Sequence, residues 1–217
     1  MADLKLYFFP RACSGVTMTA LDMAGFDYDR QVINIFKGEQ KSPEYLAIHP
    51  GGQVPALVVD GKPVSENSSI LMLLDQMAPE AGILPASDDP VAKAGYRSDL
   101  IRCSASIHPA MRQIRMPMRF TKDTDFAGIY ADGVEKLSMA LDPIEARLTG
   151  QPWFYGEKMS IIDVYLRWIL RTAMSAEFPM ETRPNLLDHS ARVEAHPSYQ
   201  AAMALEAGAE KAAGLSY

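Results

Sequence analysis

Glu66 and Asn67 stand at the start of an apolar, helix-forming run, where a small charged ligand could bind. The first turn of a helix offers unpaired N–H groups to a carboxylate, and the Glu66 carboxylate could hold an ammonium group. A sharp turn at Val54-Pro55 would also leave the Val54 N–H and C=O groups able to pair with an extended peptide. Together these residues suggest a site for a small peptide with a free amine and a free carboxylate. An ordinary hairpin followed by a capped helix would give the same pattern.

The segments around these residues predict the elements that hold them in place. Residues 56–59 form a short apolar run that is typical of a buried strand. An Asp-Gly pair follows, which is a strong hairpin signal, so residues 62–65 are expected to be the return strand. A helix then opens near Asn67. The bond before Pro55 is of the one kind that can be cis at little cost, so a tight cis corner is possible there.

Four segments precede this hairpin in the order strand, helix, strand, helix. They are predicted at residues 4–8, at 14–24, at 28–35 and from Ser42-Pro43 onward, where Ser42 would cap the helix. A parallel unit followed by a hairpin and a covering helix is a thioredoxin-like order. We therefore expect residues 1–79 to form an α/β domain of that kind.

From residue 80 onward the sequence predicts only helices. Residues 80–89 read as a linker, and residues 90–217 as an all-helical domain. Pro109 interrupts the first long helix and predicts a kink, and Ser160 and Asp163 have the spacing of a reciprocal helix cap. The apolar stripe of the first long helix advances by threes and fours and consists of Leu100, Cys103, Ile107, Met111, Ile114 and Met118.

Composition excludes several classes of function. The chain has 217 residues, of which 48% are apolar and 22% charged, and its net charge of −6 shows no nucleic-acid footprint. It has no apolar run of the roughly 18 residues that a membrane helix needs. The start lacks the features of an export signal, so Cys13 and Cys103 are expected to be reduced thiols in the cytoplasm. No cluster has the spacing of a metal site.

Several of these segments, taken in order, resemble the glutathione transferases. Residues 49–57 resemble that family's turn into its cis-proline, and residues 65–70 resemble its acidic–serine motif, with Asn67 where the family usually has Ser. Residues 156–166 resemble its helical core motif. The resemblance implies an α/β N-terminal thioredoxin-like domain, an all-α C-terminal domain that forms the second-substrate site, and glutathione as co-substrate with no metal. Asn caps a helix as well as Ser does, so the anion site should survive the change.

Within that family, residues 7–14 resemble the bacterial beta class, in which tyrosine, cysteine and serine follow this spacing. The resemblance implies that Cys13 or Ser14 acts on the glutathione sulfur, Ser14 by donating its hydroxyl and Cys13 by donating S–H or by bonding to the sulfur. Otherwise Ser14 is a plain helix cap and Cys13 a packing residue. His108 resembles a beta-class histidine that faces the active site, with Pro109 in place of the family's lysine; it could equally pack or cap at the kink.

The expected activity is transfer of the glutathione thiolate to a small apolar electrophile, by a cytoplasmic homodimer with a detoxification role and without nucleic-acid or membrane partners. A thiol transferase or reductase that works through a mixed disulfide at Cys13 is the alternative enzyme. A protein that only binds glutathione or a hydrophobic ligand is the non-enzyme alternative. Glutathione binding is expected at Tyr7, Gln53, Val54, Pro55, Glu66 and Asn67, and catalysis at Cys13, Ser14 and His108. The second substrate is expected to contact Phe9, Met111, Met118 and Trp168, although Trp168 lies on a helix that is apolar on several faces and could instead be a core residue.

Overall fold

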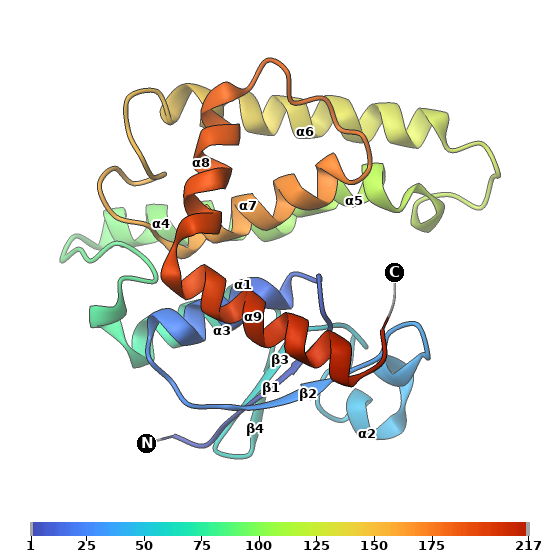
Figure 1. Cartoon of the computed structure of the whole chain (residues 1–217), viewed down its shortest axis with the longest axis vertical. Coiled ribbons are helices and arrows are strands. Elements are labelled where there is room, and N and C mark those ends of the chain that lie inside the picture. The colour runs from blue at the N-terminus through green and yellow to red at the C-terminus, as the bar shows by residue number, and fades with distance from the viewer. Residues whose placement is uncertain (1, 216–217) are drawn as a thin grey trace. The chain divides into compact units, whose positions relative to one another are not determined.

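The computed structural model describes residues 2–215 and is shown in Figure 1. The chain divides into two compact units, Met1–Ile83 together with His196–Tyr217, and Leu84–Ala195. The first unit is a thioredoxin-like α/β fold and the second is helical, which confirms the fold class expected from the sequence. Among the described residues, every helix is too short or too polar to span a bilayer.

The first unit is built on a mixed four-stranded sheet. Its strands are β1 (Leu4–Phe8), β2 (Asp29–Val32), β3 (Ala56–Val59) and β4 (Lys62–Ser65), in the order β2-β1-β3-β4. Strands β1 and β2 are parallel, whereas β3 is antiparallel to both of its neighbours. The β3–β4 hairpin lies where its turn signal predicts. Strand β2 is shorter than the predicted span of residues 28–35.

Helices of the first unit cover the sheet. They are α1 (Ser14–Met23), α2 (Pro43–Leu46), α3 (Asn67–Met77) and α9 (Pro197–Ala212), with 3₁₀ turns at Glu39–Lys41 and Pro79–Ala81. Figure 1 shows α1 and α3 together on one side of the sheet, with α9 beside α1. The core between these layers contains fully buried side chains, among them Leu6, Phe8, Leu21, Leu57, Ile70 and Leu74.

Helix α9 closes on the first turn of α1. A Cβ atom at Gly15 would lie only 3.2 Å from Glu206 Oε1 and from Met203 Cε, so a glycine there allows the close approach. The Arg11 guanidinium also forms an ion pair with Glu210 at 2.8 Å. Helix α9 therefore packs on the segment that leads into Cys13.

The division of the chain into domains at residues 1–79 and 90–217, with a linker at 80–89, stays a prediction.

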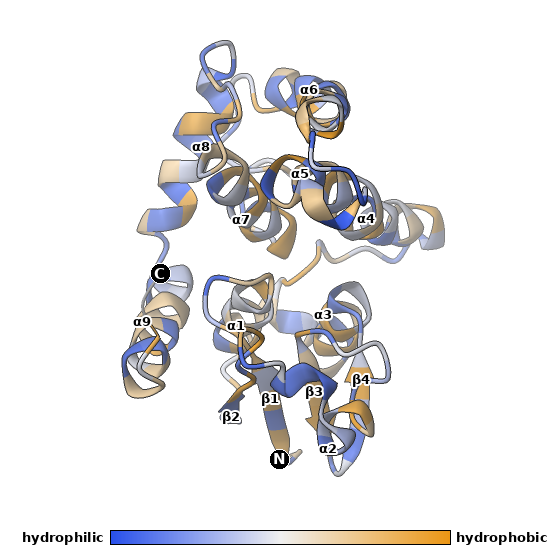
Figure 2. Cartoon of the chain, turned by 90° about the vertical axis from the view of Figure 1, so that its right-hand side faces the viewer, coloured by the Kyte–Doolittle hydropathy of each residue, from blue (hydrophilic) through white to orange (hydrophobic). Residues whose placement is uncertain are grey.

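The second unit contains α4 (Pro90–Arg102), α5 (His108–Arg115), α6 (Ala127–Arg147), α7 (Ile161–Met174) and α8 (Pro184–Ala195), with a 3₁₀ turn at Pro117–Arg119. A π-helical segment, Cys103–Ile107, joins α4 to α5 at the place where Pro109 predicts a kink. Figure 2 shows hydrophobic residues on the side of α6 that faces α5. Met118 leaves the buried stripe, because α5 ends at Arg115 and the Met118 side chain is 55% exposed.

A capping box at the start of α7 organises the core of the second unit. The buried Asp163 carboxylate accepts hydrogen bonds from the Ser160 N–H at 2.7 Å and from the Ser160 hydroxyl at 2.9 Å. It also accepts from the Phe154 N–H at 2.7 Å, and it pairs with His189 Nε2 at 2.7 Å. The predicted reciprocal cap is confirmed, and the same carboxylate joins α7 to α8 and to the loop before α7.

Candidate functional site

Cys13 lies at the junction between β1 and α1, in the N-cap position of the helix. The preceding turn is tight, with Arg11 at φ 64°, in the left-handed region that non-glycine residues seldom adopt. The half-buried Cys13 Sγ lies 3.6 Å from the Val54 carbonyl oxygen, to which it donates. The thiol therefore stands at a helix N-terminus, where the helix dipole favours negative charge, and beside the backbone group expected to pair with a peptide.

Ser14 is fully buried and its hydroxyl group faces the preceding turn. Its Oγ donates to the Phe9 carbonyl at 2.9 Å and accepts from the Phe9 N–H at 3.3 Å. Both bonds fasten the turn that carries Cys13. In this arrangement the Ser14 proton is directed at Phe9. Ser14 does not cap α1, because Cys13 occupies the N-cap position and α1 has no side-chain cap hydrogen bond. Donation by Ser14 to a glutathione sulfur stays a prediction.

The corner before β3 packs on a small hydrophobic cluster that consists of Ile33, Tyr45 and Ala56. The Val54-Pro55 peptide bond is cis, as considered from the sequence, and the strand ladder begins only at Ala56. The Tyr45 hydroxyl donates to the Gln53 carbonyl at 2.6 Å, and the Tyr7 and Tyr45 rings lie 5.8 Å apart. Tyr7 and Val54 both pack on this cluster. The structure thus brings the predicted binding residues Tyr7, Gln53, Val54 and Pro55 together around Tyr45, and Val54 also contacts Cys13.

Glu66 connects β4 to α3 in a strained conformation. Its φ is 67° and its side chain is exposed, while its carbonyl accepts the Ile70 N–H. A non-glycine residue at positive φ costs on the order of 1–3 kcal/mol and is concentrated at ligand sites. The strain therefore falls on the residue that the sequence selects for the ammonium group.

Asn67 does not cap α3, which corrects the expectation that its amide would serve the anion site as a capping side chain does. The first turn has no side-chain cap bond, and Asn67 is buried. Its Oδ1 accepts from the Thr17 hydroxyl at 2.6 Å and its Nδ2 donates to the Cys13 carbonyl at 3.0 Å. Both ends of the amide are thus used to tie α3 to α1. The Asn67 backbone N–H still lies in the first turn of the helix.

His108 begins α5 and packs on aromatic side chains of α7. Its Nδ1 lies 3.3 Å from the Tyr165 hydroxyl, and its ring meets the Trp168 ring edge-on with centroids 4.6 Å apart. Burial, together with the smaller effect of the nearby Arg112 charge, lowers the pKa of His108 to about 3. The ring is therefore neutral near pH 7. Its role toward a sulfur stays a prediction.

The four residues expected to contact the second substrate differ in exposure. Phe9, Met111 and Trp168 are only 4%, 1% and 7% exposed, whereas Met118 is 55% exposed. Phe9 meets the Phe36 ring edge-on, with centroids 5.3 Å apart. Phe36 is 70% exposed, and sequence reasoning missed it because Phe36 continues the apolar run of Val32, Ile33 and Ile35, in which residue type does not show which side chain is exposed. The second-substrate role of the four residues stays a prediction.

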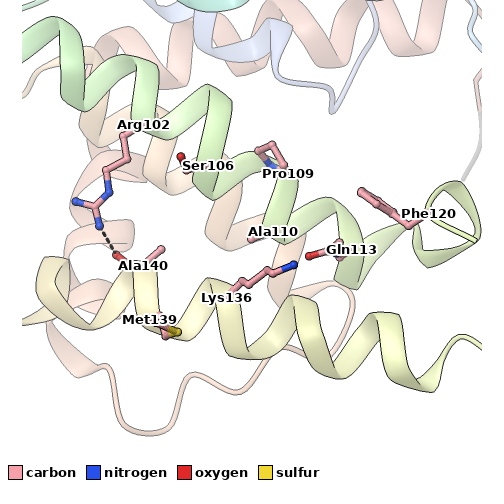
Figure 3. Close-up of a pocket in the computed structure, with 9 residues that line it drawn as sticks. All are labelled: Arg102, Ser106, Pro109, Ala110, Gln113, Phe120, Lys136, Met139 and Ala140. Atoms are coloured by element: carbon pink, nitrogen blue, oxygen red, sulfur yellow. Dashed lines mark hydrogen bonds between the residues drawn. The ribbon is translucent and has the colours of Figure 1, made fainter.

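The second unit also has an open cavity of about 520 Å³, lined by residues of α4, α5 and α6 and of the segments that join them. Figure 3 shows Arg102 reaching across it to the Ala140 carbonyl, to which it donates at 3.4 Å. Lys136 pairs with Asp132 at 2.6 Å, and Gln113 donates to the same carboxylate at 2.9 Å. No predicted site residue lines this cavity: its walls are Arg102, Ser106, Pro109, Ala110, Gln113, Phe120, Lys136, Met139 and Ala140.

The sequence is similar to curated proteins of two related kinds. It is 27% identical to a maleylacetoacetate isomerase of Pseudomonas aeruginosa over 92% of this chain and 95% of that protein. It is 41% identical to a zeta-class glutathione S-transferase of Euphorbia esula, but over only 49% of this chain and 47% of that protein. Relatives named as transferase and as isomerase are thus both represented.

Solved structures resemble most of the chain. A glutathione transferase homologue from Sulfitobacter, determined with bound glutathione, has a TM-score of 0.81 and 28% identity over 93% of this chain and 97% of that chain. A beta-class enzyme of Sphingomonas chungbukensis has a TM-score of 0.80 and 25% identity over 93% and 98%. The model of the glutathione S-transferase N-terminal domain matches residues 2–76, and that of the C-terminal domain matches residues 109–197. The chain therefore belongs to the glutathione S-transferase family.

Proposed function

We propose that the protein binds glutathione in its first unit and transfers the glutathione sulfur to the carbon atom of a small apolar electrophile. The observation that carries this proposal is the Cys13 thiol, which lies 3.6 Å from the Val54 carbonyl at the N-terminus of α1. The Cys13 thiol, which could contact the glutathione sulfur, therefore lies beside the Val54 backbone, which could pair with the glutathione peptide.

Glutathione fits the chemistry of the groups around Cys13. The Val54 N–H and C=O groups would pair with the backbone of the tripeptide as an added strand does. The exposed Glu66 carboxylate would bind the γ-glutamyl ammonium group, and the N–H groups of the first turn of α3 would bind its carboxylate. Because the Asn67 amide is already bonded to α1, this anion site would consist of backbone groups.

Cys13 would act on the bound sulfur directly. The helix dipole at the start of α1 favours the thiolate form of glutathione, and the Cys13 S–H group would donate to it. The thiolate would then attack the electrophile, forming a carbon–sulfur bond. We assign Ser14 to holding the turn, since its hydroxyl bonds Phe9 on both sides. The spacing of Tyr7, Cys13 and Ser14 supports a beta-class assignment.

Isomerisation is the second candidate, supported by the similarity to a maleylacetoacetate isomerase along almost the whole chain. In such a reaction the glutathione thiolate would add to a conjugated cis double bond. Rotation about the resulting single bond, followed by elimination of the thiolate, would give the trans product and regenerate glutathione. Conjugation and isomerisation would both use the glutathione thiolate bound beside Cys13, so the two activities can be distinguished only by the substrate that the protein converts.

Thiol transfer is the third candidate and uses Cys13 covalently. A Cys13 thiolate would attack a mixed disulfide of glutathione, release the other thiol and leave a Cys13–glutathione disulfide, which a second glutathione would resolve to oxidised glutathione. The partly exposed position of Cys13 supports this route.

Absence of all three activities in a protein that still binds glutathione would indicate a binding protein. A cytoplasmic homodimer remains our expectation for the assembly, to be measured by light scattering.

The deciding experiment compares the three reactions in one preparation. Glutathione is supplied with 1-chloro-2,4-dinitrobenzene, with maleylacetoacetate or with a glutathione mixed disulfide, and the wild type is assayed beside Cys13→Ala and Cys13→Ser. We expect conjugation to be the fastest reaction and to fall in Cys13→Ala. Isomerisation faster than conjugation, or activity confined to the mixed disulfide, would overturn this ranking in favour of the corresponding candidate.

A further inference from the structure

Phe36 is a large aromatic side chain held at the surface of the first unit. It is 70% exposed, although an aromatic ring ordinarily gains by burial. Its ring stands perpendicular to the buried Phe9 ring, with an interplanar angle of 89° and centroids 5.3 Å apart. This edge-to-face contact favours one orientation of the Phe36 ring at the surface.

The backbone around Phe36 forms a braced turn. The buried Asn34 Oδ1 accepts hydrogen bonds from the Phe36 N–H at 3.1 Å and from the Lys37 N–H at 3.2 Å. The Asn34 N–H donates to the Glu39 carboxylate at 2.7 Å, and the Asn34 carbonyl accepts from the Glu39 N–H at 3.2 Å. These bonds keep the turn from folding Phe36 into the core or swinging it outward.

The partner of Phe36 is part of the turn that positions the thiol. The Phe9 carbonyl accepts from the Ala12 N–H at 3.2 Å and from the Ser14 hydroxyl at 2.9 Å. Cys13 lies between these two donors in the sequence. Phe9 itself is only 4% exposed, whereas Phe36, whose ring contacts the Phe9 ring, is 70% exposed.

We propose that Phe36 contacts the second substrate and makes the enzyme selective for planar, conjugated electrophiles over small aliphatic ones. This inference rests on the proposed function. A ring fixed edge-on to its neighbour presents a face on which a flat electrophile can stack, and an aromatic pair is worth about 0.5–1.5 kcal/mol beyond its buried area, or roughly 2- to 10-fold in affinity. An aliphatic electrophile gains little from such a face.

The kinetic test uses 1-chloro-2,4-dinitrobenzene as the planar electrophile and iodoacetamide as the aliphatic one. In both reactions the glutathione thiolate forms a carbon–sulfur bond and the halide leaves with the bonding electron pair. Phe36→Ala should raise KM for the planar electrophile roughly 2- to 10-fold, with kcat changed less than about twofold. KM for glutathione and the kinetics with iodoacetamide should be unchanged, and Phe36→Tyr should restore the planar KM. Met139→Ala, which removes a side chain that is 69% exposed on α6, is the matched control.

Binding gives a readout that does not depend on turnover. Calorimetry should show that the wild type binds S-(2,4-dinitrophenyl)glutathione more tightly than glutathione, and that Phe36→Ala loses this difference while Met139→Ala keeps it. Equal KM changes for both electrophiles, or an unchanged planar KM in an active enzyme, would overturn the role of Phe36 alone. A lower mass of Phe36→Ala by light scattering would assign the ring to contact between copies instead. A wild type that conjugates neither electrophile would refute the proposed function and this inference with it.

Discussion

Asn67 provides the sharpest test of how the thiol is positioned. Its amide joins the start of α3 to α1 through the Thr17 hydroxyl and the Cys13 carbonyl. Replacing it with alanine removes two hydrogen bonds and leaves a fully buried Thr17 hydroxyl without its acceptor. Each buried polar group that loses its partner costs about 1–3 kcal/mol. We therefore expect Asn67→Ala to lower the free energy of unfolding by about 2–4 kcal/mol.

Urea unfolding followed by far-UV circular dichroism measures this loss, and hydrogen exchange at the α1 amides shows whether it falls on that helix. Ser69→Ala, at the exposed position two residues further along α3, is the matched control and should change stability by less than about 0.5 kcal/mol. Asn67→Ser should lie between the two, because one hydroxyl can replace only part of the amide. The rate at which iodoacetamide alkylates Cys13 should change in Asn67→Ala but not in the control.

A double-mutant cycle isolates the bond between the two helices. Thr17→Val removes the hydroxyl donor while keeping the shape of the side chain, so its effect should be smaller in the Asn67→Ala background than in the wild type. A coupling free energy of at least about 0.5 kcal/mol is expected for groups in direct contact. Strictly additive effects, or an Asn67→Ala variant as stable as Ser69→Ala, would refute the assignment of the amide to this link.

Four other outcomes are expected. Glu66→Gln should weaken glutathione binding roughly 10- to 100-fold by calorimetry, because a charge-assisted hydrogen bond contributes about 1.5–3 kcal/mol; unchanged affinity would remove Glu66 from the site. Intact-mass spectrometry after incubation with oxidised glutathione should show one reducible adduct that is absent in Cys13→Ala, since burial raises the pKa of Cys103 to about 12 and keeps that thiol protonated; two adducts would contradict this. The pKa of His108 is about 3 in the folded protein and about 6.5 in the unfolded protein. Between these two pH values only the unfolded state binds a proton at His108, so the free energy of unfolding decreases as the pH falls from 6.5 toward 3. Between pH 7 and pH 5 the wild type should therefore lose about 2 kcal/mol more than His108→Gln in urea titrations, and parallel losses would refute the burial argument. Asp163→Asn should cost about 3–5 kcal/mol, because the amide nitrogen cannot accept the hydrogen bonds that converge on this buried carboxylate; a loss below 1 kcal/mol would contradict the proposed importance of the network.

Local chemistry made much of the first unit predictable. The Asp-Gly turn, the apolar run of β3 and the Ser42 cap each act over a few residues, and each lies where the sequence indicates. The same holds for the Ser160–Asp163 box. The predictions that were wrong concern side chains whose partners lie far away in the sequence. Asn67 reads as a cap because caps are local, but its partner Thr17 lies 50 residues away and has no sequence signal.

The remaining differences have the same origin. Pro109 correctly marks an interruption in the long helix, but a proline alone does not specify that the preceding residues form a π-helix. The Ser14 hydroxyl is directed at Phe9 by the tightness of a turn that includes a non-glycine residue at positive φ, which sequence patterns seldom indicate. Phe36 continues an apolar run, so residue type alone does not show that its side chain is exposed. The directions in which side chains of the site point therefore could not be predicted from the sequence.

Helix α9 has a consequence for how the protein is made. It packs against α1 and forms an ion pair with Arg11 through Glu210, although the chain between them encodes the entire second unit. During synthesis the sheet, α1 and α3 leave the ribosome long before Pro197–Ala212 exists. Until α9 has been translated, the surface of α1 that α9 covers is therefore exposed to solvent or bound by a chaperone. The surroundings of Cys13 are completed only when a segment that is translated after the whole second unit packs against α1.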